Sequence, residues 1–256
     1  MSQTFLTSLI GRRRGKFAQW LAQQHTTPRI AWYPSAGTDF RALMYLHPSY
    51  QAYHAPTQAE PACPDLFLFT DYFPWTDSHF LDSPLIYSDL NTTMTIECME
   101  ELPSLGLTRH PELVMITEPN VATNKLLYLQ VKVESRLLGS WTSHVLYAFA
   151  ENETFYAHKM APQNAQISHI IHVRYGGGLG GGGMASGMWI LHVLKKLQCE
   201  VLVSDGHYSW QTGDLFALQQ FKEISYQQEG FLRSTRKVNS DSWSGHGDVH
   251  WNLVEY

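Results

Sequence analysis

Charged residues are scarce in this sequence, and those present leave a small negative excess. They make up 16% of the 256 residues, and 18 Lys and Arg stand against 23 Asp and Glu, a formal net charge of -5. A folded domain usually has about a quarter charged residues. A slightly acidic chain has no overall attraction to phosphate backbones, so the composition gives no global nucleic-acid signal.

Cysteines and long apolar runs are also lacking. The three cysteines, Cys63, Cys98 and Cys199, are odd in number and form no CxxC motif, which argues against a disulfide framework or a zinc knuckle. The sequence has no run of about eighteen apolar residues, so no membrane-spanning helix and no membrane partner are expected. The first basic cluster follows the first apolar residues, the reverse of a secretory signal. A cytoplasmic location is therefore expected.

What the sequence does contain is a large apolar fraction, 44% of the residues. This amount suits a substantial core in a single domain over residues 1–256. Residues 1–24 are predicted to form an N-terminal amphipathic helix, interrupted by basic residues between two glycines. Residues 92–157 are rich in alternating apolar and polar positions, which predict antiparallel strands forming an extension or an insertion.

Strand, turn and helix patterns alternate on both sides of this middle segment. Such alternation is typical of an α/β fold with helices on both faces of the sheet. We therefore expect a Rossmann-like three-layer domain with a mixed sheet and an antiparallel strand-rich middle segment. The strands outside that segment are expected at 29–33, 65–70, 168–175 and 199–203, with helices at 38–46 and 184–197.

A glycine-rich turn, GGGLGGGG at residues 176–183, is the most distinctive motif. The pattern GxGxxG fits it in two registers, between a predicted strand and a predicted helix, a context that favours a nucleotide-like ligand. Asp205 stands about 25 residues later, where a carboxylate could reach ribose hydroxyls. Seven glycines in eight positions also suit a flap or a partner interface, because such a run is costly to order. The candidate ligand-binding glycines are Gly176, Gly178, Gly180 and Gly183.

The segment RIAWYPSAGTDFRAL, residues 29–43, and the following PDLFLFTD resemble the strand–Gly–helix motif of class I S-adenosylmethionine-dependent methyltransferases. In that family a glycine turn lets the cofactor's methionine and ribose pack on the chain, and an acidic residue after the second strand holds the ribose. The resemblance implies that Gly37 is the turn glycine and Asp71 the ribose partner, with Asp39 and Arg41 at the helix mouth. S-adenosylmethionine or another nucleotide is the implied cofactor. A capped turn without a ligand is the alternative.

Histidines supply two further candidates. His207 with Asp205 follows a predicted strand at the end where α/β folds bind ligands, which suits general acid or base catalysis. In an extended segment His246, Asp248 and His250 would share one face and could hold a divalent metal such as Zn²⁺. In both places a purely structural role is the alternative. No GxSxG motif occurs, so a serine hydrolase of that type finds no support.

These features lead to three hypotheses of different classes. The first is an α/β protein that binds a small nucleotide-like ligand and acts as a methyltransferase-like enzyme. The second is a metal-dependent hydrolase that uses the C-terminal His/Asp cluster. The third is a non-catalytic protein that binds a partner, including another copy of itself as a homo-oligomer.

Overall fold

The computed structural model describes residues 2–11, 14–34, 36–50, 63–71, 78–87, 91–107, 124–150, 152–172, 201–204, 222–227 and 250–255. The helices among them are α1 (Ser2–Ile10), α2 (Lys16–Ala22), α3 (Ala42–Tyr45), α5 (Ser78–Leu81), α6 (Asn152–Phe155), a π-helix (Tyr156–Met160) and a 3₁₀ turn (Ala161–Gln163). The strands are β1 (Ile30–Pro34), β2 (Leu66–Asp71), β3 (Leu85–Tyr87), β4 (Thr92–Leu102), β5 (Lys125–Ser135), β6 (Gly139–Phe149), β7 (His169–His172), β8 (Val201–Ser204), β9 (Lys222–Gln227) and β10 (His250–Glu255).

All ten strands belong to one mixed sheet, with the order β3-β4-β5-β6-β2-β1-β7-β8-β10-β9. The expectation of an α/β protein with a mixed sheet is thus confirmed. Five neighbouring strands, β6, β2, β1, β7 and β8, are parallel to one another. Every residue of β1 and β2 is buried, as expected for parallel strands covered on both faces. The carboxyl ends of these strands therefore meet at one edge of the sheet.

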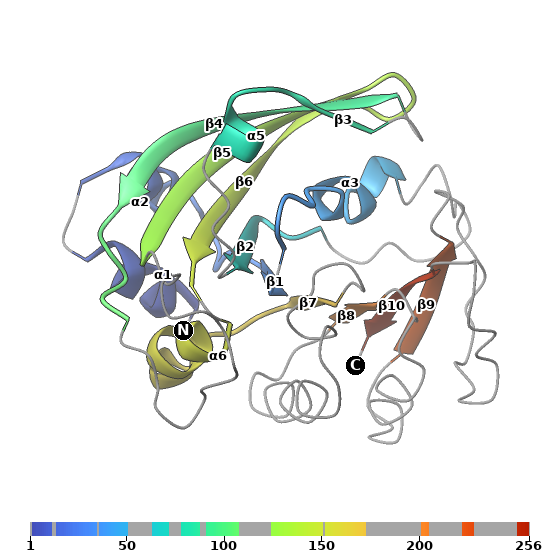
Figure 1. The fold of residues 1–256 in the computed structure, drawn as a ribbon. Helices are drawn as coiled ribbons and strands as arrows, with labels where there is room; N and C mark the ends of the chain where they lie inside the picture. The colour runs from blue at the N-terminus through green and yellow to red at the C-terminus, as the bar shows by residue number, and fades with distance from the viewer. Residues whose placement is uncertain are drawn as a thin grey trace, which may run out of the picture.

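The antiparallel part of the sheet is an extension of the parallel part. Strands β4, β5 and β6 each have eleven residues and pair antiparallel, and the short β3 lies at the outer edge. Because β6 also pairs with β2 in parallel, the segment continues the sheet and is not an insertion beside it (Figure 1). The strand pattern expected through residue 157 ends earlier, at Phe149. The chain then forms α6, where the buried Asn152 accepts a hydrogen bond from the Thr70 hydroxyl at 2.6 Å.

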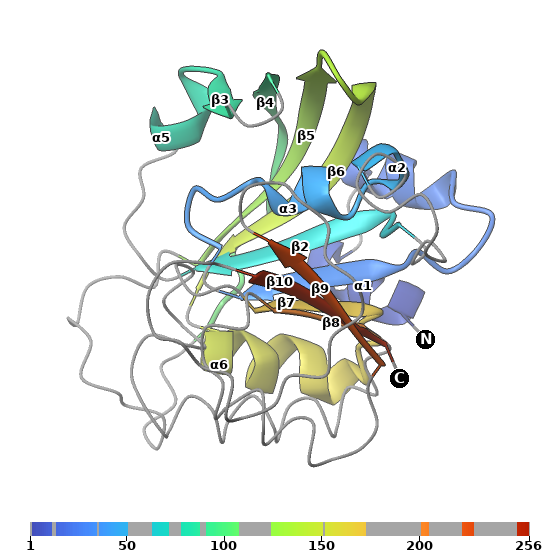
Figure 2. The same cartoon turned by 90° about the vertical axis from the view of Figure 1, so that its right-hand side faces the viewer.

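Two hydrophobic cores lie on opposite faces of the sheet. Within β1, Ile30 and Trp32 belong to the core under α1, α2 and α6, whereas Ala31 and Tyr33 belong to the core under α3. This alternation is the period of two that a strand imposes on its side chains. Figure 2 shows α3 on one side of the parallel strands and α6 on the other. Helices thus cover both faces of this part of the sheet.

The N-terminal segment forms two helices instead of the one expected over residues 1–24. Helix α1 ends before Gly11, which has a φ of 62°, a left-handed conformation that glycine adopts without strain. Helix α2 then starts after Gly15, whose backbone is extended. The apolar residues that predicted an amphipathic segment, such as Phe5 and Phe17, are buried as expected.

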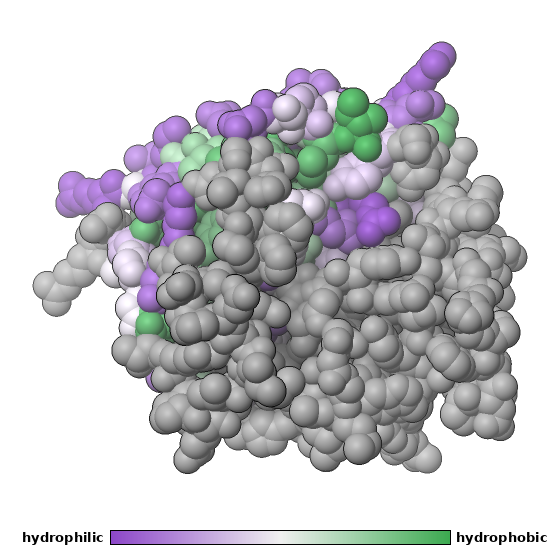
Figure 3. All heavy atoms as spheres, viewed as in Figure 1, coloured by the Kyte–Doolittle hydropathy of each residue, from purple (hydrophilic) through white to green (hydrophobic). Residues whose placement is uncertain are grey.

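The described surface of the antiparallel extension carries many hydrophilic side chains (Figure 3). The large apolar side chains exposed among the described residues are Ile86, on β3, and Leu137, in the turn between β5 and β6. Isolated apolar side chains are normal on a protein surface and do not mark a docking site. None of the helices in the described ranges has the length and apolarity that a membrane crossing requires.

Candidate functional site

The chain turns sharply where β1 ends, beside the carboxyl ends of β2 and β6. The amide of Ala36 donates to the Thr70 carbonyl at 3.3 Å, and the amide of Asp39 donates to the Ala36 carbonyl at 2.9 Å, which closes a tight turn. Gly37 in this turn has a φ of 54°. A residue with a Cβ atom is strained in that conformation, so the turn requires glycine here.

Side chains from two strands hold the peptide groups of Gly37. Its N–H donates to Asp71 Oδ2 at 2.7 Å, and its carbonyl accepts a hydrogen bond of 2.8 Å from the Tyr147 hydroxyl. Asp71 ends β2 and is 6% exposed, while Tyr147 lies in β6 and is fully buried. Burial and the nearby carboxylate of Asp71 raise the pKa of Tyr147 well above its usual value. The phenol therefore stays protonated and remains a donor at physiological pH.

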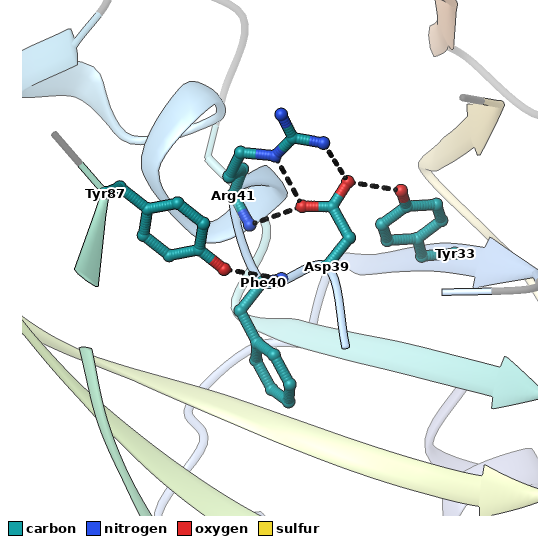
Figure 4. Close-up of polar contacts among 5 residues, drawn as sticks. All are labelled: Tyr33, Asp39, Phe40, Arg41 and Tyr87. Carbon is teal, nitrogen blue, oxygen red and sulfur yellow. Dashed lines mark hydrogen bonds and ion pairs between the residues drawn. The ribbon is translucent and has the colours of Figure 1, made fainter. Parts of the chain in front are cut away.

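The carboxylate of Asp39 is saturated by hydrogen bonds from its own neighbourhood (Figure 4). Its Oδ1 accepts from the backbone N–H of Arg41 at 3.1 Å and from Arg41 Nε at 2.7 Å. Its Oδ2 accepts from the second guanidinium nitrogen and from the Tyr33 hydroxyl, both at 2.9 Å. Asp39 therefore holds the Arg41 guanidinium in a bidentate ion pair at the start of α3.

Most backbone amides of the turn are already used. The amides of Gly37, Asp39 and Arg41 donate in the hydrogen bonds described above. The N–H of Phe40 also donates, to the Tyr87 hydroxyl oxygen at 3.3 Å. A phosphate group at a glycine turn is normally bound by free backbone amides. Four occupied amides in the five residues from Gly37 to Arg41 make this turn a poor phosphate site.

The structure brings together the four residues that the resemblance predicted for this region, Gly37, Asp39, Arg41 and Asp71. Tyr147, which also contacts the turn, was missed. Its sequence context, HVLYAF, indicates only a strand, and the parallel pairing that places it beside Phe69 is not readable from local sequence.

Of the remaining predicted site residues, His250 lies within the described ranges, as the first residue of β10. Among the residues that the structure describes, no group of three His, Cys, Asp or Glu side chains could hold a metal ion. The predicted residues that lie outside the described ranges are Gly176, Gly178, Gly180, Gly183, Asp205, His207, His246 and Asp248.

A buried histidine, His169, lies away from this turn. It is the first residue of β7, which runs parallel to β1, and so belongs to the opposite edge of the sheet. The Ser168 hydroxyl oxygen lies 3.0 Å from the Ile30 carbonyl oxygen, to which it donates, and 2.8 Å from His169 Nδ1. Its Nε2 is buried and has no hydrogen-bond partner in the described part of the chain. Burial, with a smaller effect from Arg29, lowers its pKa to about 3.

These observations define an α/β protein with a mixed sheet and a glycine turn held at the carboxyl edge of its parallel strands. The chain belongs to a family described as "Domain of unknown function (DUF7663)", whose sequence model matches residues 2–220. The match includes the Gly37 turn and residues 176–183, and it excludes the His/Asp cluster at 246–250. No curated protein and no solved structure matches the chain.

Proposed function

We propose that this protein binds a small nucleoside-containing ligand at the Gly37 turn and acts as a methyltransferase-like enzyme that uses S-adenosylmethionine. The observation that carries the proposal is the contact between two parallel strands at their carboxyl ends. There the turn glycine after β1 and the acidic residue ending β2 are in direct contact, with 2.7 Å between Gly37 N and Asp71 Oδ2. These are the two positions that bind cofactor in the family that residues 29–71 resemble.

The order of the parallel strands supports a ligand site at this edge. Numbered along the chain, β1, β2, β6, β7 and β8 are the first to fifth parallel strands, and their order across the sheet is 3-2-1-4-5. This is the order of doubly wound folds, in which ligands bind outside the carboxyl ends of the strands where the order reverses. The reversal here falls between β1 and β7, next to the Gly37 turn.

The last strands depart from the strand order of a dinucleotide-binding sheet. In the dinucleotide-binding order a sixth parallel strand directly follows the fifth. Here β10 lies between β8 and β9 and is antiparallel to both.

The donors and acceptors of the turn also fit S-adenosylmethionine better than a phosphorylated nucleotide. With four amides occupied, the turn offers little to a pyrophosphate. The Asp71 carboxylate is a pure acceptor when ionised, so it suits the hydroxyl donors of a ribose. Bound S-adenosylmethionine supplies an electrophilic methyl group. The residues of this chain hold the ribose through Asp71 and let the ligand approach the backbone at Gly37.

Isothermal titration of the purified protein tests the proposal. S-adenosylmethionine and S-adenosylhomocysteine should bind, and NAD and ATP should bind at least about tenfold more weakly, a difference of about 1.4 kcal/mol. In the variant Asp71→Asn the affinity for S-adenosylhomocysteine should fall by about tenfold or more, because hydrogen bonds to a charged group are worth about 1.5–3 kcal/mol.

A matched control is available at the opposite end of β2. Asp65 precedes β2 and accepts the Arg29 amide at 2.7 Å, the same length as the bond between Gly37 and Asp71. The variant Asp65→Asn should leave the affinity unchanged. Absence of heat for both S-adenosyl compounds at millimolar concentration, with the fold intact by circular dichroism, would refute the proposed function.

A further inference from the structure

We infer that Tyr147 is a positioning residue for this ligand and that it aims the backbone N–H of Thr38 at an acceptor atom of the ligand. The inference rests on the proposed function, and it adds a donor to a site that otherwise presents the acceptor Asp71. The ligand that fits both groups carries hydroxyl or amine donors on one side and an acceptor, such as a carboxylate or ring nitrogen, on the other.

The ring of Tyr147 is held firmly. It is fully buried and stacks on Phe149 with 4.5 Å between ring centroids and on Phe80 with 5.4 Å. Phe69 on the neighbouring strand packs against it edge-on at 5.9 Å. Because a packed aromatic ring has few alternative rotamers, the hydroxyl is fixed where it meets the Gly37 carbonyl.

The hydrogen bond from Tyr147 fixes the orientation of one whole peptide group. The carbonyl of Gly37 and the N–H of Thr38 belong to the same planar unit, and in a trans peptide they point in opposite directions. The structure contains no cis peptide bond in its described residues. Since the carbonyl points to the buried phenol at 2.8 Å, the Thr38 N–H points away from that part of the core.

The Thr38 amide is the donor that the turn leaves unused. The amides of Gly37, Asp39, Phe40 and Arg41 all donate within the chain. Thr38 makes no hydrogen bond to any part of the chain that the structure describes, and it is half-exposed. A donor on a partly exposed residue, fixed in direction and next to the Gly37 amide that Asp71 accepts, suits recognition of a polar ligand.

The variant Tyr147→Phe tests this role, because it keeps the ring and removes only the hydroxyl. The affinity for S-adenosylhomocysteine, measured by isothermal titration, should fall by about five- to tenfold, the usual effect of one hydrogen bond. In the free variant the Thr38 amide signal in a ¹⁵N–¹H correlation spectrum should shift. In the wild type, added S-adenosylhomocysteine should move the same signal and slow its exchange with solvent.

Tyr128→Phe is the matched control. The Tyr128 hydroxyl hydrogen-bonds to His144 Nδ1 at 2.8 Å, the same length as the bond from Tyr147, and it lies at the core on the other face of the sheet. Loss of the Tyr128 hydroxyl should leave the affinity for S-adenosylhomocysteine and the Thr38 amide signal unchanged. A Tyr147→Phe variant that binds like the wild type overturns the inference. The same holds if Thr38 does not respond to bound ligand in the wild type.

The two proposals can fail separately. If the wild type binds neither S-adenosyl compound, the proposed function falls and the role of Tyr147 toward that ligand falls with it. If the wild type binds and Asp71→Asn weakens binding while Tyr147→Phe does not, only the role of Tyr147 is overturned.

Discussion

The side chain of Glu100 caps helix α2 from a distant strand, and this cap leaves room only for glycine at position 15. Replacing Gly15 should therefore disturb the cap. The side chain of Glu100, on β4, reaches the start of α2 and accepts the N–H of Phe17 at 2.9 Å. A Cβ atom on Gly15 would collide with the carboxylate of Glu100. The N-cap position itself provides no side chain, so Glu100 acts as the cap from across the fold.

The size of the effect follows from two opposing contributions. In Gly15→Ala the carboxylate must move away, and losing a cap costs about 1 kcal/mol, within a range of about 0.5–2. The backbone of Gly15, with φ -119° and ψ -177°, is also accessible to alanine. Replacing glycine at such a position lowers the conformational entropy of the unfolded chain, which stabilises the fold by about 0.4–1 kcal/mol. The free energy of unfolding should therefore fall by roughly 0.5 kcal/mol in the wild-type background. In a Glu100→Ala background, where no side-chain cap is left to lose, the change should be more favourable by about 1 kcal/mol.

Urea denaturation of four proteins measures this difference between the two backgrounds. The wild type, both single variants and the double variant are compared by tryptophan fluorescence, and the coupling between the two sites should be about 1 kcal/mol. If Gly15→Ala has the same effect with and without Glu100, the carboxylate is not the cap and the reasoning is refuted.

Two further predictions concern titration. His169 has its pKa lowered from 6.5 to about 3, so the unfolded chain binds the proton more readily. Stability present above pH 6.5 should be lost as the pH falls toward 3, by up to about 1.4 kcal/mol per pH unit, and His169→Asn should flatten this slope in urea titrations at several pH values. Burial, with the nearby charge of Asp65, raises the pKa of Cys63 to about 11, whereas Cys98 is exposed. Iodoacetamide at pH 8 should therefore alkylate Cys98 well before Cys63, which peptide mass mapping would show; equal rates would contradict the burial of Cys63.

The parallel strands could be predicted from sequence because burial on both faces leaves a clear pattern. The residues IAWY and LFLF are continuous apolar runs, and both became fully buried strands. The turn after β1 was also readable, since Gly37 is needed for its positive φ. The interruption of the N-terminal helix was visible as two glycines. Its outcome, two separate helices, depended on the positive φ of Gly11.

The pairing of β6 could not be predicted in the same way. Its alternating pattern indicates one buried face, but it does not tell which strand lies beside it or in which direction. The parallel register that sets Tyr147 beside Phe69 joins residues far apart in the chain. Tyr147 therefore had no local signal, although it contacts the same glycine as Asp71, which the sequence did single out.

The chemical character of a glycine turn is set by contacts that the motif does not contain. A strand–Gly–helix sequence suits an anion when its amides stay free, and suits hydroxyl donors when acidic side chains take those amides. In the Gly37 turn, Asp71 on β2 accepts the Gly37 amide and Tyr87 on β3 accepts the Phe40 amide, and the sequence singled out only the first of these two acceptors. The same criterion applies to residues 176–183. That run is a phosphate site only if its amides are left without internal acceptors, so its glycine content alone does not decide between a nucleotide and a partner surface.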